Sequence, residues 1–159
     1  MTTENPNTTA GPDPVAQATK VVIAVDDSPQ SIDAVHAAYR FFGRSAHYTV
    51  VSIGRPPQML MPMSPLGMEA PLVELPPDEG EAHLARERAT EAADELPVGA
   101  DVASGIGLAG EQVCRYAKDH DTEVIVIGSH DRSILDRLLH PSVGRYIVEH
   151  APCSVLIVR

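Results

Sequence analysis

The sequence is poor in aromatic residues and in positive charge. It has no Trp and only two Phe in 159 residues, so a packed core must be built from Val, Ile, Leu and Ala. Its 12 Lys and Arg are outnumbered by 22 Asp and Glu, which leaves a formal net charge of -10. A surface of that sign repels phosphate backbones and anionic lipid. The charge therefore argues against nucleic acid and membrane surfaces as general partners.

Cysteine and long hydrophobic runs are also scarce. The two cysteines, Cys114 and Cys153, lie far apart, and neither a C-x-x-C pair nor a Cys/His cluster is present, so we expect no metal site. No run of about 18 apolar residues occurs, which predicts that no helix spans a membrane. The first residues show neither the basic segment nor the apolar stretch of a secretory signal, and we expect a cytoplasmic protein.

The composition suits one domain with two irregular segments. With 159 residues, 43% of them hydrophobic, the chain can bury a sizeable core. Residues 1–18 are rich in Thr, Asn, Pro and Gly, and we expect a flexible tail there. Residues 54–77 hold seven of the 14 prolines and four of the five methionines, which predicts an irregular insert. That insert either covers one flank of the domain or offers protein partners an adaptable surface.

Apolar runs and helical periodicity alternate along the rest of the chain. The expected strands are residues 20–25, 48–53, 98–104, 123–127 and 153–158. The expected helices are residues 29–42, 79–96, 109–120 and 142–150, the first with Ser28 as its N-cap. Runs that are apolar on both faces are typical of parallel strands covered by helices. The alternation predicts an α/β fold with a doubly wound five-stranded parallel sheet.

Polar residues gather where two of these strands end. The first strand is followed by Asp26, Asp27 and Ser28, and the fourth by residues 128–133, G-S-H-D-R-S. Ligands of doubly wound sheets bind beyond the carboxyl ends of strands, where the strand order reverses. Ser142 then opens the last helix, whose free N–H groups favour an anion. The pattern predicts a ligand site at this edge of the sheet.

Four motifs resemble those of the universal stress proteins, and the resemblance spans about residues 19–159. The motifs are A-V-D-x-S at 24–28, G-S-H-x-R-S at 128–133, L-L-x-x-S-V at 138–143 and A-P-C-S-V-L-I-V at 151–158. The resemblance implies an adenine nucleotide alpha hydrolase-like sheet with strand order 3-2-1-4-5. It also implies a homodimer formed through the last strand, from Cys153 to Val158. An apolar edge strand of this kind exposes unpaired backbone groups that pairing would hide.

The resemblance further implies a site for an adenine nucleotide, ATP or AMP. It would place Asp26 at the adenine or ribose, and Ala24 and Ile53 in the adenine pocket. The residues that it would place at the ribose and phosphates are Gly128, Ser129, His130, Arg132, Ser142 and Val143.

Two of the three glycines in the family's motif G-x2-G-x9-G-[S/T] are replaced here, by Asp131 and Pro141. Asp131 adds a side chain and a negative charge where the backbone would approach phosphate. Pro141 removes a backbone N–H donor. A lost charge-assisted hydrogen bond costs about 1.5–3 kcal/mol, so we expect weak or absent binding of a triphosphate.

Structural roles for the same residues remain open. Asp26 can simply close a turn, and Ser142 can be no more than an N-cap. The sequence G-x-G-x-x-G at 105–110 matches a dinucleotide-binding fingerprint, but only two strands follow it, and a tight turn between strand and helix is favoured.

Three functions follow from these patterns. The first is a regulatory module of the stress response whose nucleotide binding is weakened or lost. The second is a working binder of ATP, AMP or a cyclic nucleotide. The third is an enzyme that uses His130 and Asp131, but the chain has no G-x-S-x-G nucleophile motif. We expect no robust turnover, although slow ATP hydrolysis stays open.

Overall fold

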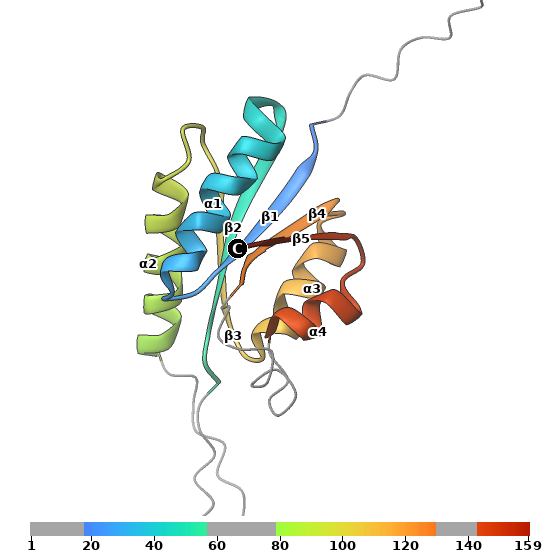
Figure 1. The fold of residues 1–159 in the computed structure, drawn as a ribbon. Helices are drawn as coiled ribbons and strands as arrows, with labels where there is room; N and C mark the ends of the chain where they lie inside the picture. Colours follow the sequence, from blue (N-terminus) through green and yellow to red (C-terminus); the bar gives the residue numbers. More distant parts are fainter. Residues whose placement is uncertain (1–17, 57–78, 130–142) are drawn as a thin grey trace, which may run out of the picture.

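The computed structural model describes residues 18–56, 79–129 and 143–159 as one parallel sheet with helices on both faces (Figure 1). Its strands are β1 (Lys20–Val25), β2 (His47–Gly54), β3 (Asp101–Ile106), β4 (Val124–Gly128) and β5 (Ser154–Val158). Its helices are α1 (Pro29–Phe42), α2 (Glu79–Asp94), α3 (Ala109–Asp119) and α4 (Val143–His150), with a short 3-10 turn, η1 (Gly43–Ser45). The strand order β3-β2-β1-β4-β5 confirms the predicted doubly wound sheet.

The strand order reverses between β1 and β4. The chain winds outward from β1 through β2 to β3 and then returns to β4, which pairs with the other side of β1. Ala24 therefore lies between Val51 of β2 and Ile127 of β4. The carboxyl ends of β1 and β4 lie side by side, which is where such sheets bind ligands.

Two hydrophobic layers sandwich the sheet, and β1 contributes to both. Val21, Ile23 and Val25 pack with α1 and α2, whereas Val22 and Ala24 pack in the layer of α3 and α4. The remaining buried members of the first layer are Ala34, Val35, Ala38, Tyr48, Val50, Ala89, Ala92, Leu96 and Val126. Burial on both faces explains why β1 is a continuous apolar run.

Helix α1 has the predicted ends and the predicted N-cap residue, but not a capping side chain. Pro29 is its first residue, and Gly43 follows it with a positive φ of 66°, a conformation that costs glycine little. Ser28 occupies the N-cap position, yet its side chain makes no capping hydrogen bond. The Ser28 hydroxyl donates to the Asp26 carboxylate instead, because that stronger acceptor lies within reach.

The third strand is displaced from its predicted position. Residues 98–104 were the sequence-based expectation, whereas β3 is Asp101–Ile106. Val98 and Ala100 pack against the layer of α1 and α2 before the strand begins, and Ile106 pairs with Gly54 at its far end. Pairing with β2, rather than its own weak apolar pattern, fixes the limits of this strand.

The glycine-rich sequence at 105–110 forms a turn between β3 and α3. Gly107 has φ 140° and donates its N–H to the Gly54 carbonyl at 3.1 Å. A tight turn was the favoured interpretation of this motif. Gly54 is the last residue of β2 and not part of the insert. The rest of that predicted insert from residue 57 on, and the predicted tail up to residue 17, lie outside the described residues.

Candidate functional site

The reversal between β1 and β4 brings several predicted site residues to one edge of the sheet. Ala24 pairs with Ile127, the last pair between β1 and β4, and Asp26 and Ser129 each lie two residues beyond this pair along the chain. Ile53 lies near the carboxyl end of the neighbouring β2, where it pairs with Gly105 of β3. Parallel strands end at the same edge, so these positions lie along the carboxyl-end edge of the sheet, which we call the carboxyl-end crevice after the place where such sheets bind ligands. Asp26 directly follows β1, and Gly128 is the last residue of the neighbouring β4, so these two strand ends are adjacent as predicted.

The Asp26 carboxylate is already held by its own turn. Its Oδ1 accepts hydrogen bonds from the Ser28 N–H at 3.0 Å, from the Ser28 hydroxyl, and from the Ser31 hydroxyl at 2.7 Å. The Asp26 N–H donates in turn to the buried Ser31 oxygen at 2.8 Å. These bonds fix the connection from β1 to α1. The turn role that the sequence left open is thus real, and it fixes the direction of this carboxylate.

Gly128 faces α1 and not the crevice. A Cβ at this position would lie 2.5 Å from the Gln30 carbonyl oxygen, at the start of α1. The neighbouring residue Ile127 packs in the opposite layer, with α3 and α4. Alternation along a strand explains the difference. The fold needs glycine here for the close packing of α1 against β4.

Ser129 carries a buried hydroxyl that has no hydrogen-bond partner in the described part of the chain. The residue is 9% exposed, and its N–H donates to the Val158 carbonyl of β5 at 2.7 Å. Its Oγ is enclosed and unpaired. A buried hydroxyl without a partner is costly. The Ser52 hydroxyl and the Gln30 side-chain oxygen are also buried and unpaired among the described residues, and of these three residues Ser129 is the one that belongs to the predicted site.

The other residues predicted for the ribose and phosphates are mostly outside the described residues. These are His130, Asp131, Arg132 and Ser142. Val143 is described and is the first residue of α4, with 49% of its surface exposed.

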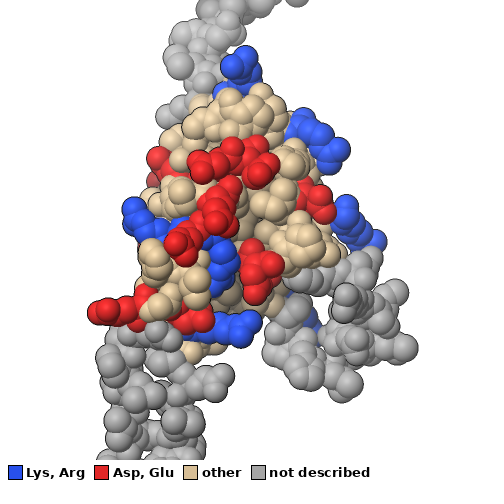
Figure 2. Space-filling view, turned by 90° about the vertical axis from the view of Figure 1, so that its left-hand side faces the viewer, with Lys and Arg blue, Asp and Glu red and all other residues tan. Residues whose placement is uncertain are grey.

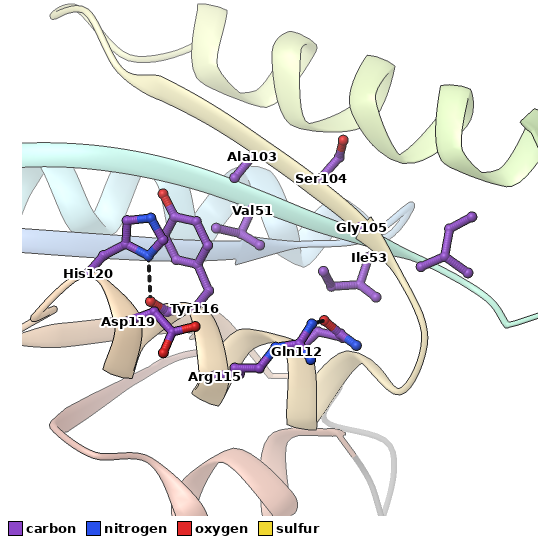
Figure 3. Close-up of a pocket in the computed structure, with 11 residues that line it drawn as sticks. Val51, Ile53, Ala103, Ser104, Gly105, Gln112, Arg115, Tyr116, Asp119 and His120 are labelled. Carbon is purple, nitrogen blue, oxygen red and sulfur yellow. Dashed lines mark hydrogen bonds between the residues drawn. The ribbon is translucent and has the colours of Figure 1, made fainter. Parts of the chain in front are cut away.

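A cavity of about 320 Å³ lies between α3 and the β2–β3 side of the sheet (Figure 3). Its apolar floor is formed by Val51, Ile53 and Ala103, and it extends past Gly105, which has no side chain. Helix α3 packs against β2 more closely than against β3, which leaves this space beside the edge strand. We call it the α3 cavity.

Polar and aromatic groups of α3 form the opposite wall of the α3 cavity. The Arg115 guanidinium donates to the Gln112 side-chain oxygen. The rings of Tyr116 and His120 stack with centroids 3.9 Å apart, and the His120 Nδ1 lies 2.9 Å from the Tyr116 carbonyl oxygen. Figure 3 shows Arg115 beside Gln112, with Asp119 and His120 further along α3.

The family resemblance implied that Ile53 lies in an adenine pocket, and Ile53 lies in the floor of the α3 cavity, but no sequence pattern singled out the residues of α3. Gln112, Arg115 and Tyr116 are spaced as on any amphipathic helix, and their pattern carries no ligand motif. The signal becomes visible only when the position of α3 relative to β3 is known.

Neither cysteine is poised as a nucleophile. Burial raises the pKa of the Cys114 thiol, with a further increase from the nearby Cys153, and burial also raises the pKa of Cys153. Both thiols therefore stay protonated at neutral pH. Within residues 18–56, 79–129 and 143–159, no three His, Cys, Asp or Glu side chains converge as metal ligands. Among the described helices, none has the length and apolar character needed to cross a bilayer.

The fold and the crevice define a class: doubly wound α/β domains that bind ligands where the strand order reverses. The model of the universal stress protein family matches residues 18–159, and the chain belongs to that family. A segment of 53 residues is 38% identical to universal stress protein Slr1101 of Synechocystis, and it spans 33% of this chain and 49% of that protein.

Solved structures share the fold at low sequence identity. One is a universal stress protein in complex with cyclic AMP, with a TM-score of 0.64 and 21% identity over 91% of this chain and 99% of that one. Another is an Arabidopsis thaliana protein of the family with AMP bound, with a TM-score of 0.56 and 15% identity over 88% of this chain and 90% of that one.

Proposed function

We propose that this chain is a regulatory module of the stress response that binds an adenine nucleotide weakly and disfavours ATP. The observation that carries the proposal is the buried, unpaired Ser129 hydroxyl at the carboxyl-end crevice, in the residue that follows β4, the neighbour of β1. Such a hydroxyl is satisfied when a ligand oxygen or nitrogen reaches it. The cyclic AMP and AMP bound to the two structural relatives make an adenine nucleotide the ligand to test.

Weak binding of phosphates follows from the residues that replace glycine in the family's motif. Asp131 brings a negative charge, and Pro141 offers no N–H, so the loop has fewer donors and more repulsion for a triphosphate. The net charge of -10 adds to that repulsion. The proposal includes no catalytic turnover, because no described group is activated for nucleophilic attack.

Thermal shift measurements with ATP, ADP, AMP and cyclic AMP at millimolar concentration test this function. A ligand present at about 100 times its Kd stabilises the folded state by about 2.7 kcal/mol. Weakly bound ATP at millimolar concentration is much closer to its Kd, so it should shift the melting temperature little. We expect AMP or cyclic AMP to give the larger shift. A shift of several degrees with ATP would favour the second candidate, a working ATP binder.

The double variant Asp131→Gly/Pro141→Gly tests whether restoring the two glycines strengthens ATP binding. Restoring both glycines removes the carboxylate and returns one N–H donor, so ATP binding should strengthen by about tenfold or more. The melting temperature without nucleotide serves as the control for folding. An unchanged ATP affinity would mean that these two replacements do not cause the weak binding.

The proposed module acts as a homodimer through β5. Three of the six exposed large hydrophobic residues in the described chain belong to α4 and β5: Val143, Val148 and Ile157. Strand β5 is an edge of the sheet and pairs with β4 on one side. Pairing with a second copy would cover both the apolar side chains and the free backbone groups.

A further inference from the structure

We propose that the α3 cavity receives the phosphate of a nucleoside monophosphate and that Arg115 binds it, an inference that rests on the proposed weak nucleotide binding. The phosphate would thus lie on the α3 side of the site, away from the loop that follows β4.

The cavity shares the residue Ile53 with the predicted base site. Ile53, expected in the adenine pocket, lines the cavity and pairs with Gly105. A Cβ at Gly105 would lie 3.5 Å from the Ile53 Cδ1 atom, so glycine keeps the floor between β2 and β3 flat and open. A planar base can lie on this floor while its substituent reaches toward α3.

Charge places the phosphate at one end of the cavity. Arg115 is the only Lys or Arg among the 11 lining residues, and the Gln112 amide lies beside it. A Cβ at Gly107 would lie 3.0 Å from the Gln112 Nε2, so this amide donor is located near the turn that precedes α3. Asp119 lies further along the helix (Figure 3) and would repel an anion at the other end.

The size of the cavity favours a small nucleotide. A volume of about 320 Å³ lies at the lower end of the range of roughly 300–1,000 Å³ for small-molecule pockets. Such a space accommodates one phosphate together with part of the nucleoside, whereas a triphosphate extends beyond the single guanidinium. Arg115 thus supplies the cationic donor that the altered loop after β4 provides poorly.

Calorimetric titration of the full chain with AMP and with adenosine tests the role of Arg115. The test variant is Arg115→Gln, which removes the charge but keeps an amide. The matched control is Lys118→Gln, which removes an exposed charge from the same helix outside the cavity. Arg115 is exposed, so Arg115→Gln should retain the fold, which thermal unfolding without ligand verifies.

We expect Arg115→Gln to weaken the binding of AMP by about fivefold, which is the scale of a partly exposed charge-assisted contact. The binding of adenosine should not change. Lys118→Gln should change the affinity for neither AMP nor adenosine. Raising the salt concentration should weaken AMP binding to the wild type more than to Arg115→Gln. Equal AMP affinities of Arg115→Gln and the wild type would overturn the role of Arg115.

The two proposals fail in different ways. If adenosine and AMP bind equally well to the wild type, the phosphate site is wrong while nucleoside binding at the crevice stands. If AMP shifts the amide resonances of Ala24 and Ser129, and these shifts give the same AMP affinity for Arg115→Gln and for the wild type, only the Arg115 proposal is overturned. If neither ligand binds the wild type, both proposals are wrong.

Discussion

Single residues at the carboxyl-end crevice serve the fold as well as any ligand. Asp26 matches the family's motif, yet its Oδ1 accepts three hydrogen bonds within the β1–α1 turn. Gly128 also matches, but its missing side chain makes room for the Gln30 carbonyl of α1. A motif residue can therefore be required for packing even where ligand binding is weak. Ser129 differs, because its hydroxyl has no such structural partner in the described chain.

The variant Gly128→Ala should destabilise the protein without any ligand present. The added Cβ would lie 2.5 Å from the Gln30 carbonyl oxygen, and relieving such a clash shifts α1 at a cost of about 1–3 kcal/mol. Urea denaturation measures the change. The control Gly99→Ala adds a Cβ with nothing within 4 Å and should stay within about 1 kcal/mol of the wild type. Equal stability of the two variants would show that α1 does not pack as described.

The variant Tyr48→Phe should have a stability cost that depends on pH. The buried Tyr48 hydroxyl donates to the Gly43 carbonyl at 2.7 Å, a bond that contributes about 1 kcal/mol at pH 7. Burial, and secondarily the charge of Tyr39, raise the pKa of Tyr48 above 10.0.

Because the folded-state pKa of Tyr48 is the higher one, its protonation stabilises the fold fully below about pH 10 and progressively less above it. The stability gap between wild type and Tyr48→Phe should therefore shrink as the pH rises through that range. Urea denaturation at pH 7 and at alkaline pH measures both gaps. A gap that grows with pH would contradict the assigned environment of Tyr48.

The sequence predicted the limits of a strand or helix well where the local pattern of apolar residues alone determines them. Strands β1 and β4 are buried on both faces, and their apolar runs gave their positions to within a residue. Strand β3, D-V-A-S-G-I, has no fully buried residue, so its limits depend on pairing with β2, which no local pattern encodes. The α3 cavity could not be predicted for the same reason, because it depends on the position of α3 relative to β2 and β3.

A substitution in the edge strand β5 tests the proposed dimer. Ile157→Glu should convert the proposed dimer to a monomer, because it places a charge on the exposed edge strand that would pair with the second copy. Its matched control is Leu84→Glu on α2, since the two side chains are 47% and 48% exposed. Analytical ultracentrifugation over a range of concentrations measures the molecular mass. A wild-type monomer, or equal loss of the dimer in both variants, would contradict assembly through β5.

The charge of the whole molecule sets the background for any phosphate ligand. The flank that carries α2 mixes acidic and basic side chains, with pairs such as Arg88–Glu81 at 3.9 Å (Figure 2). No continuous basic surface covers this flank. With a net charge of -10, the long-range field opposes each added phosphate, and this cost grows from AMP to ATP.

Two-dimensional NMR of the isotope-labelled full chain, titrated with AMP and then with ATP, tests most directly whether the crevice is a weak nucleotide site. We expect amide shifts at Ala24, Asp26, Ile53 and Ser129, and we expect AMP to saturate the site at a lower concentration than ATP. Tighter binding of ATP than of AMP, or saturation by AMP with these four amides unmoved, would contradict the proposed site.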